Sequence, residues 1–233
     1  MIVMPANSTG WFWHCLARET GRIGHLYSPG AQRGPWPWFP FALDNGAFAC
    51  WDMQTNRFDD AKWEANEPAW RNLIRWAAPS GLARWAIVPD VPGDASRTFE
   101  RWEQYHQIVT DAEINTALAV QDGMTVEQVK ALAIKPSVIC VGGSTGWKWE
   151  TVEQWVKAFP RVHVLRCNSP EKLYWLESIG VESCDGTGWN RGDRKQTEGL
   201  EAWARQRPEP KPYTLTPYVC RKVKNGQEML FGY

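Results

Sequence analysis

The stretch VESCDGTGWNR, residues 181–191, combines a short apolar segment, a carboxylate and a glycine-rich turn. The apolar segment predicts a buried strand, and Asp185 stands at its carboxyl end. The glycines that follow leave room for a ligand to approach the backbone. Taken alone, this pattern is more typical of an aspartate that only caps a turn. The interpretation as a functional site depends on the recurrence of the pattern upstream.

A short apolar segment, a polar turn and a helical segment follow one another repeatedly along the chain. Strands are predicted at residues 1–6, 22–27, 41–43, 84–88, 116–120, 138–141, 161–165 and 181–184. Helices are predicted at residues 11–20, 58–78, 95–111, 126–134, 150–159, 171–179 and 197–207. Such alternation is typical of parallel strands with right-handed crossovers. It predicts an α/β fold, a (β/α)8 TIM-like barrel with irregular first units; an open doubly wound sheet is the alternative.

The chain has 233 residues, which suits a single barrel domain. Residues 1–207 are predicted to form the barrel, and residues 208–233 a short C-terminal tail packed on it. Residues 28–40 are rich in Pro, Gly and Trp and predict an ordered surface loop. Many of the 16 tryptophans lie on the predicted amphipathic helices, where we expect them to pack against the barrel.

Acidic and basic residues balance over the whole chain, with 26 of each. Their distribution is uneven, because residues 186–224 contain nine basic and four acidic residues. A basic patch next to the expected site is compatible with nucleic-acid phosphates, and a solvated tail without a partner is the alternative.

The six cysteines form no C-x-x-C pair, so the sequence predicts neither a zinc knuckle nor a redox dithiol. Several of them stand in apolar segments typical of buried, reduced thiols. No segment has the length of a membrane span, and no secretory signal opens the chain. A cytoplasmic protein without membrane contact is therefore expected.

Polar residues follow seven of the predicted strands, and in a barrel these strand ends converge on one mouth. The residues are Asn7, Asp44, Asp90, Gln121, Gly142 with Gly143, Arg166 with Asn168, and Asp185. Three carboxylates in one apolar-walled mouth repel one another, so we expect at least one to be protonated or bound to a donor-rich ligand.

Paired carboxylates suit chemistry at an acetal-like carbon, where one attacks and the other handles the proton of the leaving group. Asp90 and Gln121 offer an edge that a purine or pyrimidine matches, and the glycine pair lets backbone N–H groups reach the same ring. A divalent metal on Asp44, Asp90 and Asp185 is the competing interpretation. These turns lack the histidines that commonly accompany hydrolase metals, so no metal is predicted.

From about Phe41 to Arg194 the sequence resembles the tRNA-guanine transglycosylase superfamily, including phage and bacterial relatives that insert deazaguanine bases into DNA. Residues 44–48, Asp-Asn-Gly-Ala-Phe, are similar to the family's D-S-G-G-F-Q turn. Asp90 falls where the family has a base-binding aspartate. Further similar segments follow in the family's order, at residues 120–123 (V-Q-G-G in the family), 141–144 (its glycine pair), 168–170 and 180–185.

The resemblance implies a role for each matched position. Asp185 would be the nucleophile and Asp44 the general acid/base residue. The base would be bound by Asp90, Gln121, Gly142, Gly143 and Asn45.

Departures from the family are equally informative. The family's Cys-x-Cys-x-x-Cys and histidine zinc site is missing, since only Cys220 and no histidine follow Asp185. Neither zinc nor another cofactor is therefore expected. The length leaves no room for an appended RNA-binding domain, which favours DNA over tRNA. Asn45 and Ala49 replace a serine and a glutamine, so details of base recognition should differ.

Together these features predict base flipping, attack on the anomeric carbon by Asp185 and release of the base. Trp147 or Trp189 would stack on the base, and Arg166, Arg191 and Arg194 would bind phosphates. Entry of a free nucleobase would make the enzyme a DNA transglycosylase, and entry of water a DNA glycosylase. The alternatives are a metal- or phosphate-dependent barrel enzyme acting on a small metabolite, and a non-catalytic nucleic-acid-binding module.

Overall fold

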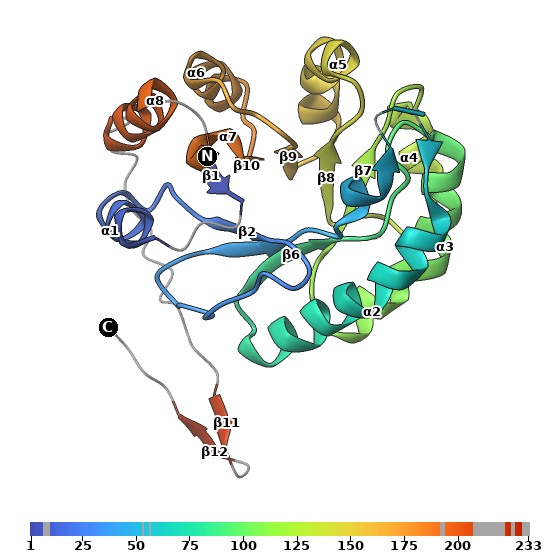
Figure 1. Ribbon diagram of the computed structural model, residues 1–233, viewed down its shortest axis with the longest axis horizontal. Helices are drawn as coiled ribbons and strands as arrows, with labels where there is room; N and C mark the ends of the chain where they lie inside the picture. Colours follow the sequence, from blue (N-terminus) through green and yellow to red (C-terminus); the bar gives the residue numbers. More distant parts are fainter. Residues whose placement is uncertain are drawn as a thin grey trace.

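Eight parallel strands form a nearly closed barrel (Figure 1) in the computed structural model, which describes residues 1–6, 10–52, 54–55, 57–191, 194–206, 222–224 and 227–229. The strand order is β1-β10-β9-β8-β7-β6-β3-β2. The strands are β1 (Ile2–Pro5), β2 (His25–Tyr27), β3 (Phe41–Leu43), β6 (Ala83–Ile87), β7 (Thr116–Val120), β8 (Val138–Val141), β9 (Val162–Val164) and β10 (Ser183–Gly186). The predicted TIM-like barrel is thus confirmed.

The first and last strands of this order meet through a few backbone contacts. The amide of Val3 donates to the carbonyl of Arg22 at 2.9 Å, and the amide of Gly24 donates back to Val3 at 2.8 Å. Isolated parallel bridges join Val3 to Ile23 and Ala6 to Leu26. These contacts bring β2 beside β1, so the carboxyl ends of all eight strands surround one mouth.

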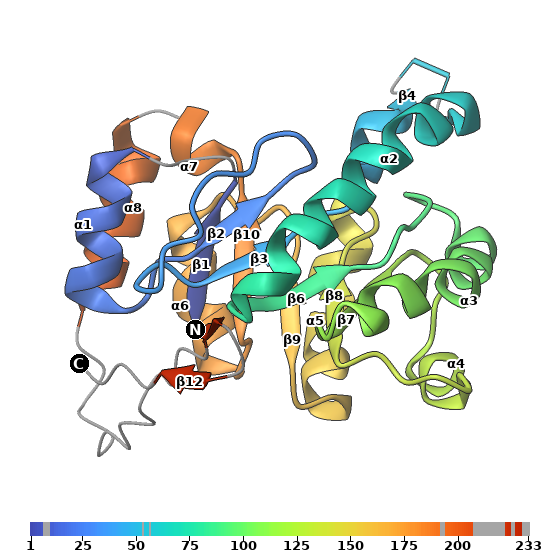
Figure 2. The same cartoon turned by 90° about the horizontal axis from the view of Figure 1, so that it is seen from below.

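Helices surround the barrel (Figure 1), and Figure 2 shows α1 beside α8. They are α1 (Trp11–Thr20), α2 (Asp60–Ala77), α3 (Ala95–Asp111), α4 (Val126–Ala131), α5 (Thr145–Ala158), α6 (Pro170–Ser178), α7 (Gly188–Arg191) and α8 (Arg194–Arg205). Two 3-10 turns, η1 (Ala47–Cys50) and η2 (Ala78–Ser80), and a hairpin of β4 (Trp51–Asp52) and β5 (Arg57–Phe58) complete the barrel's connections. No helix in the described part of the chain is long and apolar enough to cross a membrane.

The irregular first units are also confirmed, since residues 28–40, all of which the structure describes, contain no helix. Two local predictions were wrong. Helix α5 begins at Thr145 and not at Glu150, because the Asp122 carboxylate binds the amide of Ser144 and holds the start of the helix in place. The glycine-rich turn after Asp185 contains the short helix α7. The predicted tail, residues 208–233, lies outside the described residues except for β11 (Lys222–Lys224) and β12 (Gln227–Met229), which pair antiparallel.

Two apolar cores hold the barrel together. The interior core is built around Trp85. Its other buried members are Met4, Leu26, Ala42, Ile87, Ala117, Ala119, Val138 and Cys140. The outer core fills the space between strands and helices, and its largest fully buried members are tryptophans. They include Trp63, Trp70, Trp102, Trp155 and Trp203, for which packing between helix and barrel was predicted.

Glu182 anchors the end of the barrel opposite the mouth. It accepts hydrogen bonds from Arg84 at 2.8 Å and from Arg161 at 2.7 Å, which joins the starts of β6, β9 and β10. Burial raises the pKa of Glu182, but the two arginines outweigh burial and lower the pKa to about 2. The ionised form is therefore strongly favoured in the folded protein.

A depressed pKa predicts a defined loss of stability in acid. The contribution of Glu182 is fully present above about pH 4.5 and is lost as the pH falls through about 2, a difference of about 3 kcal/mol in the free energy of unfolding. Urea unfolding across this range should show a smaller acid dependence in Glu182→Gln than in the wild type. An unchanged slope would place the acid-sensitive contact elsewhere. At pH 7 the variant should already be less stable, because two partly buried arginines lose their charged partner.

Candidate active site

Asp44, Asp90 and Asp185 all lie at the mouth of the barrel. Asp44 directly follows β3, Asp90 follows β6, and Asp185 is the third residue of β10. Cys140 on β8 faces the barrel interior and reports on all three carboxylates. Burial raises the pKa of its thiol, and the negative charges of Asp185, Asp90 and Asp44 raise it further. Because β3, β6 and β10 are parallel strands of one barrel, the three predicted acids lie at the same end of it, and Asn45 contacts both Asp44 and Asp90.

Asp90 is held by two amide side chains. Asn45 Nδ2 donates to Oδ1 at 2.7 Å, and Gln121 Nε2 donates to Oδ2 at 2.6 Å. Burial raises the pKa of Asp90 to about 6; the hydrogen bond from Asn45 opposes this shift, and the charge of Asp44 adds to it. Asp90 is thus a carboxyl group that changes its protonation state close to neutral pH.

Each of the two amides is bound by the protein through both its nitrogen and its oxygen. Asn45 Oδ1 accepts from the amide of Ala47 at 2.8 Å, and Gln121 Oε1 accepts from the amide of Gly93 at 3.1 Å. Both side chains are buried. Asn45 and Gln121 therefore orient Asp90, and their role as base contacts stays a prediction.

Asp44 lies between Ser28 and the turn that follows it. Its Oδ2 accepts from the Ser28 hydroxyl at 3.1 Å, and its Oδ1 accepts from the Asn45 amide at 2.9 Å. Burial raises the pKa of Asp44, and the nearby charge of Asp185 raises it further. The hydrogen bonds from Ser28 and from the Asn45 amide oppose this shift, because they favour the ionised form.

Asp185 is only 6 % exposed and accepts two hydrogen bonds at the same oxygen, Oδ1. One comes from the backbone amide of Arg166 at 3.0 Å, and the other joins Oδ1 to His163 Nε2 at 3.2 Å. Within the described residues no hydrogen bond ends on Oδ2. The protein therefore fixes the Asp185 carboxylate through Oδ1.

Sequence reasoning assigned no role to His163, although a signal was present. The residue stands in the apolar run of residues 161–165, between Val162 and Val164. Side chains alternate along a strand, so a polar residue flanked by two outward-facing valines must face the barrel interior. The sequence alone did not show which face was which.

Arg166 connects three parts of the mouth. Its φ of 56° lies in the left-handed region, which is uncommon for a residue other than glycine and is often found at functional sites. Its guanidinium donates to the carbonyl of Gly143 and lies 5.0 Å from the ring centre of Phe48, which is 51 % exposed.

The contact between Arg166 and Phe48 spans the mouth. Phe48 lies in η1 after β3, and Arg166 follows β9. In the barrel, β8, β7 and β6 separate these strands on one side, and β10, β1 and β2 on the other. The loops of opposite strands thus meet above the carboxylates. Like His163, Phe48 was given no individual role by sequence reasoning.

Lys148 holds the loop that contains Arg166, and sequence reasoning gave it no role. It is buried on α5, and its Nζ donates to the carbonyls of Leu165 at 2.7 Å and Arg166 at 3.3 Å. Burial lowers the pKa of Lys148 to about 8, and the charge of Arg166 contributes. By binding both carbonyls, Lys148 fixes the backbone whose amide contacts Asp185.

Two predicted base contacts are wrong. Trp189 is 0 % exposed and packs in the outer core, so it cannot stack on a ligand. The amide of Gly142 donates to the carbonyl of Val120 at 3.1 Å and is therefore not available to a base. Packing explains the glycine at position 142, because an added Cβ would lie 3.3 Å from the Leu165 side chain.

The other predicted contacts lie around the mouth with different surroundings. Gly143 has a φ of 68°, and an added Cβ would lie 2.8 Å from the half-buried ring of Trp147. Arg191 is exposed at the end of α7. Arg194 has a side chain that is 90 % exposed and pairs with Glu198. Their roles as phosphate contacts, and that of Trp147 in stacking, stay predictions. Asn7 lies outside the described residues.

Asn168 explains the glycines of the deciding stretch. Its Oδ1 accepts from the amide of Gly188 at 2.8 Å. A Cβ on Gly188 would lie 2.7 Å from the same oxygen, and a Cβ on Gly186 would lie 2.6 Å from the carbonyl of Cys167. The glycines therefore let β10 and α7 pack closely against the loop after β9.

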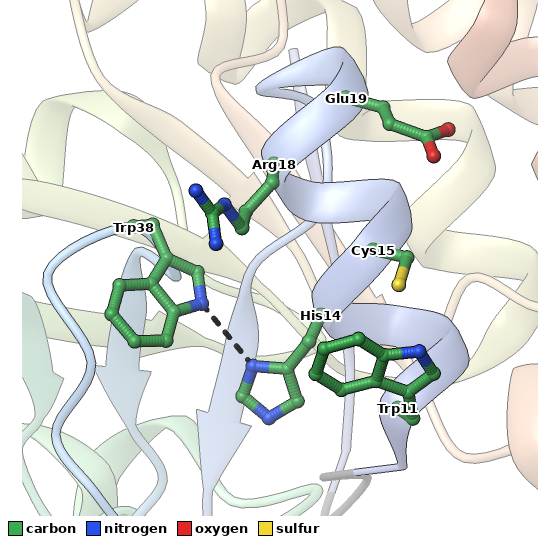
Figure 3. Close-up of a pocket in the computed structure, with 6 residues that line it drawn as sticks. All are labelled: Trp11, His14, Cys15, Arg18, Glu19 and Trp38. Atoms are coloured by element: carbon green, nitrogen blue, oxygen red, sulfur yellow. Dashed lines mark hydrogen bonds between the residues drawn. The ribbon is translucent and has the colours of Figure 1, made fainter.

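A separate pocket lies on the outer flank of the barrel (Figure 3). It measures about 280 Å³ and lies between α1 and the loop of residues 28–40. In Figure 3 the indole N–H of Trp38 points at His14 Nδ1, 3.4 Å away, with Arg18 beside the indole. Its lining residues are Trp11, His14, Cys15, Arg18, Glu19 and Trp38, none of which was a predicted site residue.

Among the residues that the structure describes, no group of three His, Cys, Asp or Glu side chains is placed to hold a metal ion. The sequence matches no protein-family model, and no curated protein sequence is significantly similar to it. The geometry of the mouth and the ordered motifs are therefore the basis for a functional assignment.

The packing at Gly186 yields a stability prediction with an internal control. In Gly186→Ala the added methyl group collides with backbone, so we expect a loss of about 3 kcal/mol in the free energy of unfolding. Gly146 in α5 has open space around its Cβ position. Gly146→Ala should therefore be neutral or more stable by up to about 1 kcal/mol. Urea denaturation of both variants tests this, and equal stabilities would contradict the packing argument.

Proposed function

We propose that this protein cleaves the N-glycosidic bond of a nucleotide flipped out of a nucleic acid, with DNA preferred over tRNA. The observation that carries the proposal is the pairing of Asp44 and Asp185 at one barrel mouth. Burial and the charge of Asp185 both raise the pKa of Asp44, which favours Asp44 as the proton donor and Asp185 as the attacking group. This division of roles is what cleavage at an acetal-like carbon requires.

In the proposed reaction, Asp185 Oδ2 forms a bond to the anomeric carbon while the bond from that carbon to the base nitrogen breaks. The electron pair leaves with the base, which takes a proton from Asp44. The covalent sugar intermediate is then released when a second nucleophile attacks the same carbon and the Asp185 carboxylate leaves. The ionised Asp44 accepts the proton of that nucleophile.

The identity of the second nucleophile distinguishes the two forms of the proposal. A free nucleobase gives base exchange, and water gives excision with an abasic site. The resemblance to the tRNA-guanine transglycosylase superfamily supports exchange of a modified base such as a deazaguanine. The proposal needs no cofactor from outside, because its proton transfers run between the two carboxyl groups and the substrate.

Phe48 and Asp90 are the groups best placed to receive the base. Phe48 is half exposed above the carboxylates, and stacking on an aromatic ring favours flat heterocycles. Each oxygen of Asp90 accepts one hydrogen bond, from Asn45 or from Gln121, and can accept a second one from the edge of a base. Arg166, together with Arg191 and Arg194, is proposed to contact the phosphates that flank the flipped nucleotide.

The proposed chemistry is tested by mass spectrometry of free bases and of digested nucleosides. The purified protein is incubated with tRNA, unmodified DNA and hypermodified phage DNA, with and without free deazaguanine bases. We expect release or exchange with one of these, and a loss of at least about 10³-fold in Asp185→Asn and Asp44→Asn.

The matched control is Asp94→Asn, which alters the N-terminal cap of α3 and leaves the three carboxylates themselves unchanged. It should keep near wild-type activity. Activity lost on chelation, without any effect of nucleic acid on stability, would support a barrel enzyme acting on a small metabolite. Binding of nucleic acid that is unchanged in Asp185→Ala, without base release, would support a non-catalytic binding module.

The stacking role of Phe48 is tested separately. Phe48→Leu keeps an apolar side chain but removes the aromatic face, so base binding should weaken by about 10-fold. The control is Phe12→Leu, which alters another exposed aromatic residue, 40 % exposed on α1. Fluorescence titration with the base identified above measures both. Equal affinities for the two variants would remove Phe48 from the proposed base site.

A further inference from the structure

His163 lies in β9 beneath the mouth and contacts the proposed nucleophile. Its side chain is fully buried. Val162 and Val164 belong to the outer core, so strand alternation turns His163 to the interior, where the Trp85 ring packs against it at a centroid distance of 4.6 Å. The imidazole is therefore held in one orientation by packing.

Both ring nitrogens contact the neighbouring strand β10. The strand register pairs His163 with Ser183, and Asp185 lies two residues further on the same face. Nδ1 lies 2.8 Å from the Ser183 hydroxyl, and Nε2 lies 3.2 Å from Asp185 Oδ1. The result is a buried chain of three polar groups that ends on the carboxylate.

The hydrogen-bonding capacities of these groups define the direction of the chain. An ionised carboxylate oxygen can only accept, so the contact to Oδ1 requires a hydrogen on Nε2. In a neutral ring with its hydrogen on Nε2, Nδ1 is an acceptor and the Ser183 hydroxyl can donate to it. Together with the amide of Arg166, His163 supplies the second donor to the same oxygen.

We infer that His163, with Ser183 behind it, is the positioning residue of Asp185. It fixes Oδ1 and thereby aims Oδ2 at the carbon that the proposed function has it attack, and the inference rests on that function. His163 itself neither gains nor loses a proton in the reaction. A reacting atom that is misplaced by about 1 Å can slow a reaction by about 10²-fold.

The kinetic test compares two substitutions of similar size. Leucine at position 163 fills space but donates no hydrogen bond, whereas the terminal amide of glutamine can replace Nε2–H. We expect His163→Leu to lower kcat for base release by about 10²-fold at an unchanged KM, and His163→Gln to stay within about 10-fold of the wild type. A leucine variant with wild-type kcat, or a folded glutamine variant as slow as the leucine variant, overturns the inference.

A spectroscopic test is independent of activity and so separates failure of this inference from failure of the proposed function. The full chain is labelled with ¹⁵N-histidine, and the resonances of His163 are identified by their loss in His163→Gln. We expect a hydrogen on Nε2, none on Nδ1, and an Nε2 shift that changes in Asp185→Asn but not in Asp90→Asn. A hydrogen on Nδ1, or no response to Asp185→Asn, overturns the inference even if base release is found. If no base is released, the expected spectrum upholds the contact while the proposed function fails.

Discussion

Three carboxylates around one barrel mouth are the constraint on which the rest of the site depends. In a buried mouth their repulsion is poorly screened, so each needs donors or a proton. Asp90 receives the amides of Asn45 and Gln121, and Asp185 receives the Arg166 amide and His163. The side chains that follow the strands are therefore occupied with the carboxylates. This is why several residues expected to face a ligand lie behind the acids.

The pKa values of buried carboxyl groups shift in opposite directions at the two ends of the barrel. At the closed end, the charge of Glu182 is balanced by two arginines, and its depressed pKa indicates a net gain for the folded state. At the mouth, the pKa of Asp90 is raised, and Arg166 has a left-handed backbone. These features cost stability, and folds retain such costs where function requires them. The contrast between the two ends of the barrel supports the mouth as the functional end, without reference to any sequence motif.

The sequence was sufficient for the architecture and only partly for the site. Residues 95–111, 116–120 and 138–141 were predicted with the observed boundaries, because apolar periodicity is a local signal. The site required tertiary information. His163 and Lys148 gain their importance from partners far along the chain, and Trp189 resembled a stacking residue until its complete burial was known. Local pattern places a residue at the end of a strand but does not say what occupies its hydrogen bonds.

The arrangement around Arg166 bears on the choice between exchange and excision. Its amide contacts Asp185, and its guanidinium lies over Phe48 across the mouth. In the proposed reaction the covalent bond to Asp185 keeps the sugar in place while the first base leaves its seat over Phe48. A replacement base must then stack on the same face of Phe48. The Arg166 side chain has to move when the first base leaves and again when the second base enters, while the Arg166 amide still binds the Asp185 carboxylate. Water needs no aromatic surface to stack on. In the proposed reaction, an exposed aromatic ring at the mouth thus gives a second base a way to compete with water, and this favours exchange over excision.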